Sequence, residues 1–114
     1  EIVDCDWSSD VCSSDLFEAE IDDHAGEQET SVMMHYHPEL VNLNEAGDGD
    51  SKPFAISSLN EKLGWAPRHW DKATVDSGVG NPKKASAEKG ERYVKPIIEK
   101  LAKLFTEVGQ GELY

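Results

Sequence analysis

Apolar residues recur at helical spacing over the last part of the chain. From Ser86 to Val108 they form one stripe with a period of about 3.6 residues, which predicts a long amphipathic helix. Ser86 is a residue type that caps helix N-termini, and Gly109 follows the stripe where a helix commonly ends. Pro96 removes a backbone hydrogen bond, so we expect a bend at residues 92–96, eased by Gly90. The stripe consists of Val94, Ile97, Ile98, Leu101, Leu104, Phe105 and Val108.

A shorter helix is expected from Glu27 to about His37. Val32, Met33 and Tyr36 share one face at helical spacing, and Pro38 marks the end of the helix. Acidic residues crowd the N-terminal end, where the helix dipole favours negative charge. These residues are Asp22, Asp23, Glu27 and Glu29.

The pattern is weaker between the two helices. Residues 40–43 are either a brief strand or the tail of the preceding turn, and residues 45–53 have the composition of a loop. Residues 54–59 are a candidate strand. Residues 65–86 mix aromatic residues, glycines and prolines, so we expect a long structured connection, a kind of segment that tends to be functional.

Residues 1–16 differ in origin from the rest of the chain. Residues 6–16, DWSSDVCSSDL, resemble a translated sequencing adapter without a mismatch, which disfavours the alternative of a natural Ser/Asp-rich linker. We therefore interpret residues 1–16 as an adapter-derived, disordered segment and residues 17–114 as the natural chain. Both cysteines, Cys5 and Cys12, lie in that segment, so the natural chain has neither a disulfide framework nor thiolate chemistry.

The chain is strongly acidic. Its formal net charge is −12, and residues 1–16 contribute five acidic and no basic residues, which leaves −7 for residues 17–114. Nucleic-acid-binding proteins normally present a basic surface, so the charge argues against a nucleic-acid partner. No apolar run is long enough to span a bilayer, and we expect no membrane partner.

The stretch DDHAGEQETS, residues 22–31, carries the strongest candidate for chemistry. A histidine just before a helix can act as an acid or a base, because imidazole titrates near neutral pH. The N–H groups around Gly26 and Glu27 can meet an anion, and Glu29 can ligate a metal or hold His24. The alternative interpretation is a helix-start histidine in a solvated acidic loop.

Three other features have weaker functional interpretations. His35 and His37 are two apart, so they point to different sides of a helix and cannot chelate a metal from one face. The glycine-rich residues 77–90 can cradle a phosphate, but they lack the glycine spacing of nucleotide-binding motifs, which favours a tight structural turn. An aromatic group either walls a pocket for a flat ring or packs within its own loop. Its members are Trp65, His69 and Trp70.

Two segments together resemble the signatures of a known family. The segments are DHAGEQETSVMMHYHPELV (23–41 most closely) and SGVGNPKKASAEKGERY (77–93). They are similar to two signatures of the creatininase, or creatinine amidohydrolase, family: His-Ala/Gly-Gly followed by Glu-Thr-Ser, and Gly-Asn/Asp-Pro followed by Glu-Lys-Gly. Both occur in the family's order, and the resemblance covers essentially all of residues 17–114, as the C-terminal part of the family domain.

The resemblance implies a fold and a chemistry. The expected fold is α/β, part of a three-layer α/β/α domain that assembles as a cytoplasmic homohexamer. Family members use two zinc or manganese ions, whose bridging water attacks a cyclic amide or a related C–N bond of a small molecule. His24 matches the histidine that we expect to protonate the departing nitrogen, and Glu29 matches an acid close to the metals. Asp23 and Gly26 are substrate-proximal candidates.

The sequence departs from the family pattern in two respects. The family's metal ligands belong upstream of this part, so we expect no metal site in this chain and no activity of the chain alone. Glu20 and Ile21 stand where creatinine-hydrolysing members carry Trp and Asp, which argues against creatinine as the substrate. The same departure supports an alternative of another class, a non-catalytic assembly or ligand-binding domain that keeps the fold.

Overall fold

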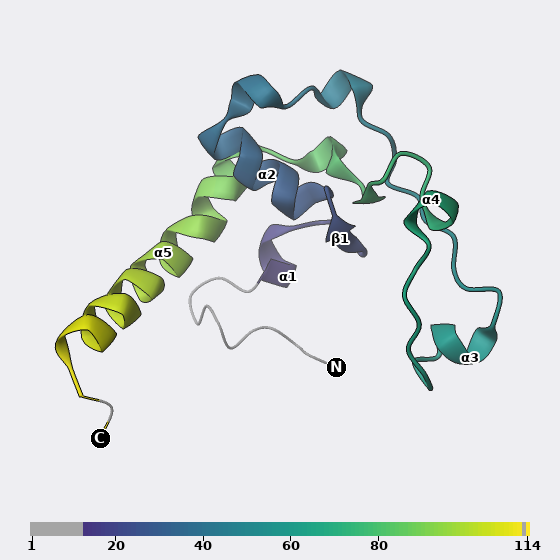
Figure 1. Cartoon of the computed structure of the whole chain (residues 1–114). Coiled ribbons are helices and arrows are strands. Elements are labelled where there is room, and N and C mark those ends of the chain that lie inside the picture. Colours follow the sequence, from purple (N-terminus) through teal and green to yellow (C-terminus); the bar gives the residue numbers. More distant parts are fainter. Residues whose placement is uncertain (1–12, 113) are drawn as a thin grey trace.

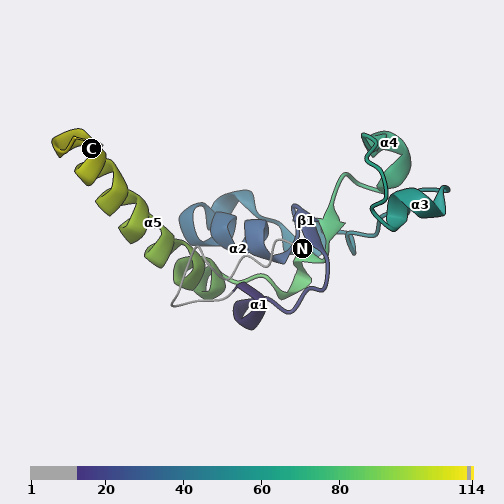
Figure 2. The same cartoon turned by 90° about the horizontal axis from the view of Figure 1, so that it is seen from below.

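The computed structural model describes residues 13–112 and residue 114. Figure 1 shows α2 lying across the N-terminal part of α5, with β1 beside α2 and with α3 and α4 on the far side of the molecule. In Figure 2, α5 projects to one side and α3 and α4 project to the other. The helices and strands are α1 (Ser13–Leu16), β1 (Asp22–His24), α2 (Glu27–Tyr36), α3 (Ser57–Asn60), α4 (Trp70–Ala73), β2 (Val79–Gly80) and α5 (Ala87–Gln110).

The predicted first helix is confirmed as α2. It ends where expected, because the backbone N–H of His37 bonds Met33 O at 2.7 Å and Pro38 begins a separate 3-10 turn. The face that packs on α5 differs from the apolar face of the sequence pattern. Its buried residues are Glu27 and Ser31, whereas Met33 is 41% exposed. Polar contacts rather than an apolar stripe therefore hold α2 in place.

The predicted C-terminal helix is confirmed as α5. The Ser86 side chain caps its N-terminus by accepting a hydrogen bond from the backbone N–H of Lys89 at 3.2 Å. The expected end was two residues too early, since the helix runs to Gln110 and is closed by Gly111. The helix continues through Pro96, and the bend near that residue stays a prediction.

Gly90 has a different role from the one we expected. A Cβ atom at this position would lie 2.1 Å from the carbonyl oxygen of Ser31 and 3.0 Å from the backbone nitrogen of Val32. Only a glycine lets α5 approach the backbone of α2 so closely. Gly90 therefore sets the distance between the two helices.

A small antiparallel sheet brings together the N-terminal parts of the two family-like segments, residues 23–41 and 77–93. β1 pairs with β2 in the register Asp22 to Gly80 and His24 to Val79, with an irregularity between the two pairs. Val79 is 2% exposed and, with Leu16 and Ala85, is one of the buried apolar residues in the described part of the chain. This combination of helices with one small sheet agrees with the expected part of an α/β domain.

The candidate strand at residues 54–59 was wrong. The segment is a loop that runs into the helical turn α3, and the Asn60 side chain bonds both backbone groups of Phe54, N–H at 2.9 Å and C=O at 2.8 Å. Residues 51–74, called the arm from here on, are closed at their base by an isolated bridge between Ser51 and Thr74. Residues 40–43 are not a strand: Leu40 ends one 3-10 turn, Pro38–Leu40, and Leu43 begins the next, Leu43–Glu45.

Most of the apolar stripe of α5 is uncovered in the described structure. The exposed fraction is 51% for Ile98, 47% for Leu104, 68% for Phe105 and 60% for Val108. Figure 2 shows this half of α5 projecting away from the other elements. Among the described helices, none is long and apolar enough to cross a membrane.

The segment that we interpret as adapter-derived is described only from residue 13 onward. Residues 13–16 form the helical turn α1 rather than the disorder that we expected, and Leu16 is buried with 6% exposure. Residues 1–12 lie outside the described residues. The origin of residues 1–16 stays a prediction.

Candidate functional site

The structure brings His24 and Glu29 together at the start of α2. His24 ends β1, and Glu29 lies in the first turn of α2. His24 Nδ1 is 3.7 Å from Glu29 Oε2, and the same oxygen accepts a hydrogen bond from the backbone N–H of Ala25 at 2.6 Å. Both side chains are about half exposed, at 52% and 59%. Glu29 is therefore placed to orient the imidazole, which stays open to a ligand.

The turn between β1 and α2 requires an unusual backbone conformation. Ala25 has a φ of 52°, in the left-handed region that residues with a Cβ rarely adopt. The following residue, Gly26, is the N-cap of α2, and a Cβ there would lie 2.0 Å from Asp22 Oδ1. The Ala-Gly pair thus turns the chain sharply between His24 and Glu29. Such strained turns are common at functional sites.

The N-terminus of α2 already faces a carboxylate of the chain itself. Asp22 Oδ2 accepts a hydrogen bond from the backbone N–H of Gln28 at 2.6 Å. Burial raises the pKa of Asp22, the Gln28 N–H opposes that effect, and the charges of Glu27 and Glu29 add to it. The expected anion site around Gly26 is therefore next to an internal acid, and an incoming anion must compete with it.

The arm contributes two side chains to the surroundings of His24. The Trp70 and His24 rings meet in a T-shaped arrangement, with a centroid distance of 5.7 Å and an interplanar angle of 78°. The Arg68 guanidinium lies 4.6 Å from the centroid of the Trp70 ring and bonds Asp23 Oδ2 at 2.5 Å. Trp70 is held in turn by a hydrogen bond from Nε1 to Ser77 O at 2.9 Å. Asp23 is thus paired with an arginine rather than free.

A cleft lies beside Glu29. It has a volume of about 370 Å³ and runs between α2, the 3-10 turns and the glycine-rich strand β2. Glu29, Met33 and Asp76 contribute side chains to its lining, whereas His24 does not line it. Gly49 also lines the cleft, and a Cβ there would lie 1.9 Å from Gly80 O, so the glycines serve close backbone approach. This agrees with the interpretation of residues 77–90 as a structural turn.

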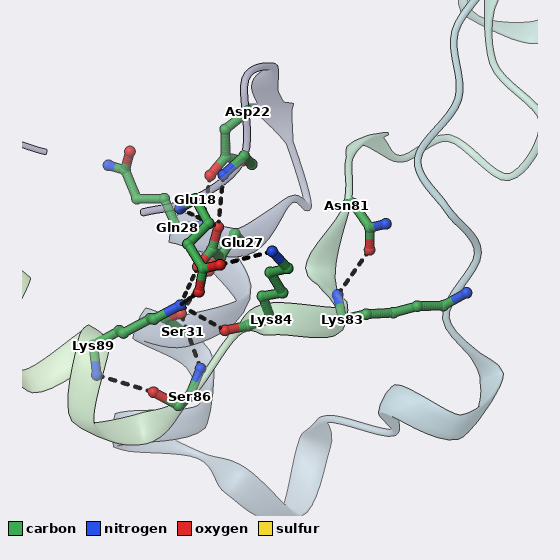
Figure 3. A network of polar contacts seen from close by, with 11 residues as sticks. Glu18, Asp22, Glu27, Gln28, Ser31, Asn81, Lys83, Lys84, Ser86 and Lys89 are labelled. Atoms are coloured by element: carbon green, nitrogen blue, oxygen red, sulfur yellow. Dashed lines mark hydrogen bonds and ion pairs between the residues drawn. The ribbon is translucent and has the colours of Figure 1, made fainter. Parts of the chain in front are cut away.

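The two sequence motifs form one polar network, which Figure 3 shows. The Glu27 side chain is fully buried and accepts hydrogen bonds from the backbone N–H groups of Glu18 at 2.8 Å and Ala19 at 2.9 Å. Lys89, 62 residues away, donates its ammonium group to Glu27 and to Glu18 at 3.2 Å. The hydrogen bond to Glu27 is the main reason that the pKa of Lys89 is raised. The hydrogen bond from Lys84 is the main reason that the pKa of Glu18 is lowered.

Ser31 makes the second link between the motifs. Its hydroxyl donates to Glu27 O at 2.6 Å and accepts from the backbone N–H of Ser86 at 3.2 Å. Gly90 packs against the Ser31 backbone, as described above. The serine of Glu-Thr-Ser and the glycine of Glu-Lys-Gly therefore form one contact, which explains physically why the two motifs occur together. The network also ties down residues 18–19, which lead into β1 and His24.

The remaining sequence candidates do not join this site. His35 meets the edge of its neighbour Tyr36, and His37 Nδ1 lies 3.2 Å from Glu39 Oε1. The proposed aromatic group does not assemble, because Trp65 is 86% exposed while Trp70 contacts His24. No set of three or more His, Cys, Asp or Glu side chains in the described part of the chain is grouped to hold a metal ion. The residues present thus do not fit a two-metal site by themselves.

A comparison with family models shows the family of the chain. The model described as creatinine amidohydrolase matches residues 2–105. The chain belongs to the creatininase family. The creatininase match begins at residue 2 and so includes most of the segment that we interpret as adapter-derived.

One solved creatininase-family structure shares the fold of the chain. It is a crystal structure of a Bacteroides fragilis protein assigned as a creatinine amidohydrolase, with a TM-score of 0.85 and 79% sequence identity. The match covers 95% of this chain and 43% of that chain, so this chain spans less than half the length of its relative. No curated protein matches the chain significantly.

Several residues around His24 escaped the sequence analysis. Arg68 carried no signal, because its partner Asp23 lies in another element and neither spacing nor composition connects them. Glu27 was noted only as an acidic residue at the start of a helix. In the structure its buried carboxylate pairs with Lys89 and forms the centre of the network. Lys89 belongs to the Glu-Lys-Gly motif, but Glu27 lies between His-Ala-Gly and Glu-Thr-Ser, so no signal connected the two residues. Asp22 was likewise noted only as one of the acids before the helix.

Proposed function

We propose that this chain is part of a metal-dependent hydrolase that cleaves cyclic amides or related non-peptide C–N bonds of small molecules. The observation that supports the proposal best is the placement of His24 and Glu29 at the start of α2, within a creatininase-family motif. The family resemblance also underlies our proposals of zinc or manganese as the metal, a cytoplasmic location and homohexameric assembly. The glutamate and isoleucine at positions 20 and 21 argue against creatinine itself.

His24 is proposed to protonate the departing nitrogen of the substrate. Its Nδ1 lies 3.7 Å from Glu29 Oε2, so the negative charge of the carboxylate favours the tautomer with a proton on Nδ1. Nε2 then faces away from that pair and can exchange a proton with a ligand once the imidazole is charged. The T-shaped contact with Trp70 also restricts the imidazole ring.

Metal ions in the family site would supply an activated water and polarise the carbonyl of the substrate. We propose that their ligands come from the part of the family domain outside this chain, which spans 43% of its relative. The chain alone is then inactive. Hydrolysis of an amide by the purified chain with added zinc or manganese, above the rate with the metal salt alone, would contradict this.

A chimera tests the proposed function. Residues 17–114 replace the matching part of the Bacteroides fragilis relative, and hydrolysis of cyclic amides and formamides is measured with zinc or manganese. We expect activity, and we expect His24→Gln to lower kcat/KM by about 100-fold or more, the usual contribution of a general acid. The matched control is His35→Gln on α2, whose ring packs against its neighbour Tyr36 and which should keep the activity.

Each outcome of the chimera experiment separates the enzyme from the non-catalytic alternative. An active chimera that loses activity with His24→Gln but not with His35→Gln supports the hydrolase and the role of His24. An equal loss of activity in both variants would mean that the substitutions destabilise α2 rather than remove a proton donor. A folded chimera with no activity, next to an active Bacteroides fragilis protein, would favour a non-catalytic domain.

A further inference from the structure

Basic side chains gather in a second pocket, which lies on the arm and is separate from the cleft beside Glu29. This arm pocket has a volume of about 590 Å³, within the range of roughly 300–1,000 Å³ typical of small-molecule sites. Three of the eleven lysines and arginines of the chain line it, in a protein with a net charge of −12. The side chains that matter here are Lys52, Phe54, Asn60, Arg68, His69 and Lys72.

Two of the lysines come from the two chain segments that close the base of the arm. The bridge between Ser51 and Thr74 closes the arm, and the backbone N–H of Lys52 bonds Ala73 O at 2.7 Å. Neither the Lys52 nor the Lys72 ammonium group has a hydrogen-bond or ion-pair partner within residues 13–112, and none of the described acidic side chains lines the pocket. The pocket therefore offers two ammonium groups that would attract a bound anion.

The rest of the arm pocket is apolar and locally braced. Phe54 and Pro53 contribute to its lining. The Asn60 carboxamide bonds the backbone N–H and C=O of Phe54, at 2.9 and 2.8 Å, and so holds that residue in place. An apolar wall next to a few convergent charged groups is the usual composition of a site for a small organic ligand.

We propose that the arm pocket binds a small multivalent anion, with phosphate or carboxylate groups facing Lys52 and Lys72. Arg68 and His69, which also line the pocket, supply further donors. Arg68 also bonds Asp23 and lies against Trp70, whose ring contacts His24. A ligand in the arm pocket is therefore linked to the surroundings of His24 through Arg68. The binding itself does not depend on amide hydrolysis, so the two proposals can fail separately.

Titration of the full 114-residue chain tests this proposal. Inorganic pyrophosphate and citrate serve as the phosphate and carboxylate probes, each compared with sodium chloride at equal ionic strength. Calorimetry reports the affinity, and the indole N–H resonance of Trp70, assigned with Trp70→Phe, reports the link through Arg68. We expect saturable binding of at least one probe and a shift of that resonance.

Two double variants decide whether the pocket is responsible. Lys52→Gln with Lys72→Gln should weaken binding by about tenfold or more, with an intermediate loss for each single variant. Lys62→Gln with Lys95→Gln removes the same charge from exposed lysines outside the pocket and should leave the affinity unchanged. All four side chains are exposed, and circular dichroism checks that helix content is kept.

Each result has a defined meaning. Binding of pyrophosphate alone or of citrate alone, lost in the pocket variant, supports the proposal and identifies the anionic group. An equal loss in both double variants would show that binding follows net charge and would overturn the proposal. Absence of saturable binding beyond the chloride control would overturn it as well.

Discussion

The contact between α2 and α5 can be tested with two glycines of the same helix. Gly90→Ala places a methyl group 2.1 Å from Ser31 O and 2.6 Å from Ser31 C, both of them backbone atoms. Gly109→Ala, also within α5, places the same methyl group where no atom lies within 4 Å. Both changes improve helix propensity by up to about 1 kcal/mol, so they differ only in the contact that they create.

The magnitude follows from the distances at Gly90. Carbon atoms in contact normally lie about 3.5–4.0 Å apart, so the helices must separate by more than about 1 Å, which loosens every contact between them. Overpacking of this kind costs about 1–3 kcal/mol and outweighs the gain in helix propensity. We expect Gly90→Ala to lose about 1–2 kcal/mol of unfolding free energy, or about 5–10 °C in Tm. Gly109→Ala should keep or raise the Tm.

Thermal and urea unfolding, followed by circular dichroism at 222 nm, measure both variants against the unchanged chain. The Gly109→Ala variant controls for the general effect of alanine in α5. A Gly90→Ala protein as stable as the Gly109→Ala protein would refute the reasoning, because α2 and α5 would then not be in close backbone contact.

Two further predictions concern the charged groups around the site. Lys89→Met leaves the Glu27 carboxylate fully buried with only two backbone donors, so we expect a loss of about 3–5 kcal/mol, against almost none for the exposed Lys95→Met. Because the pKa of Lys89 is raised, its stabilising contribution to the free energy of unfolding is complete below the ordinary value of 10.5 and is lost as the pH rises through the raised value. In urea unfolding, the stability difference between the unchanged chain and Lys89→Met should therefore narrow only in strong alkali. Burial raises the pKa of Asp22, so its charged form destabilises the fold once the pH exceeds that value, and Asp22→Asn should gain less than about 1 kcal/mol at pH 7. This gain in stability should vanish below pH 3.8, the ordinary pKa of an aspartate. If Asp22→Asn were less stable than the unchanged chain at pH 7, the hydrogen bond from Gln28 and the helix dipole would outweigh the cost of burial.

The sequence alone determined the two main helices and the family. A helix depends on residues within one or two turns of each other, so apolar spacing, the Ser86 cap and the stop before Pro38 were enough to locate α5 and α2. The family was recognisable for a similar reason, since each motif is contiguous. His24 and Glu29 could be considered together because they are five residues apart across one turn, and the structure places them 3.7 Å apart.

Only the tertiary structure decided what depends on distant parts of the chain. A strand forms only with a partner, and the side chain of Asn60 takes both backbone groups of Phe54, so the β-like composition of residues 54–59 did not predict their structure. The sequence suggested that Gly90 eases a bend in the helix. Its contact with the backbone of Ser31 could not be predicted, because the residues next to Gly90 in the sequence carry no information about it.

The charged clusters follow the same logic. Lys89 and Glu27 are 62 residues apart. The pairing of Arg68 with Asp23 and the lysines that line the arm pocket also join separate segments. Long-range electrostatic pairs leave no periodic trace along a chain, since their energy depends on where the backbone brings the charges and on how deeply they are buried. The sequence therefore determined which chemical groups are present, and the fold determined which of them meet.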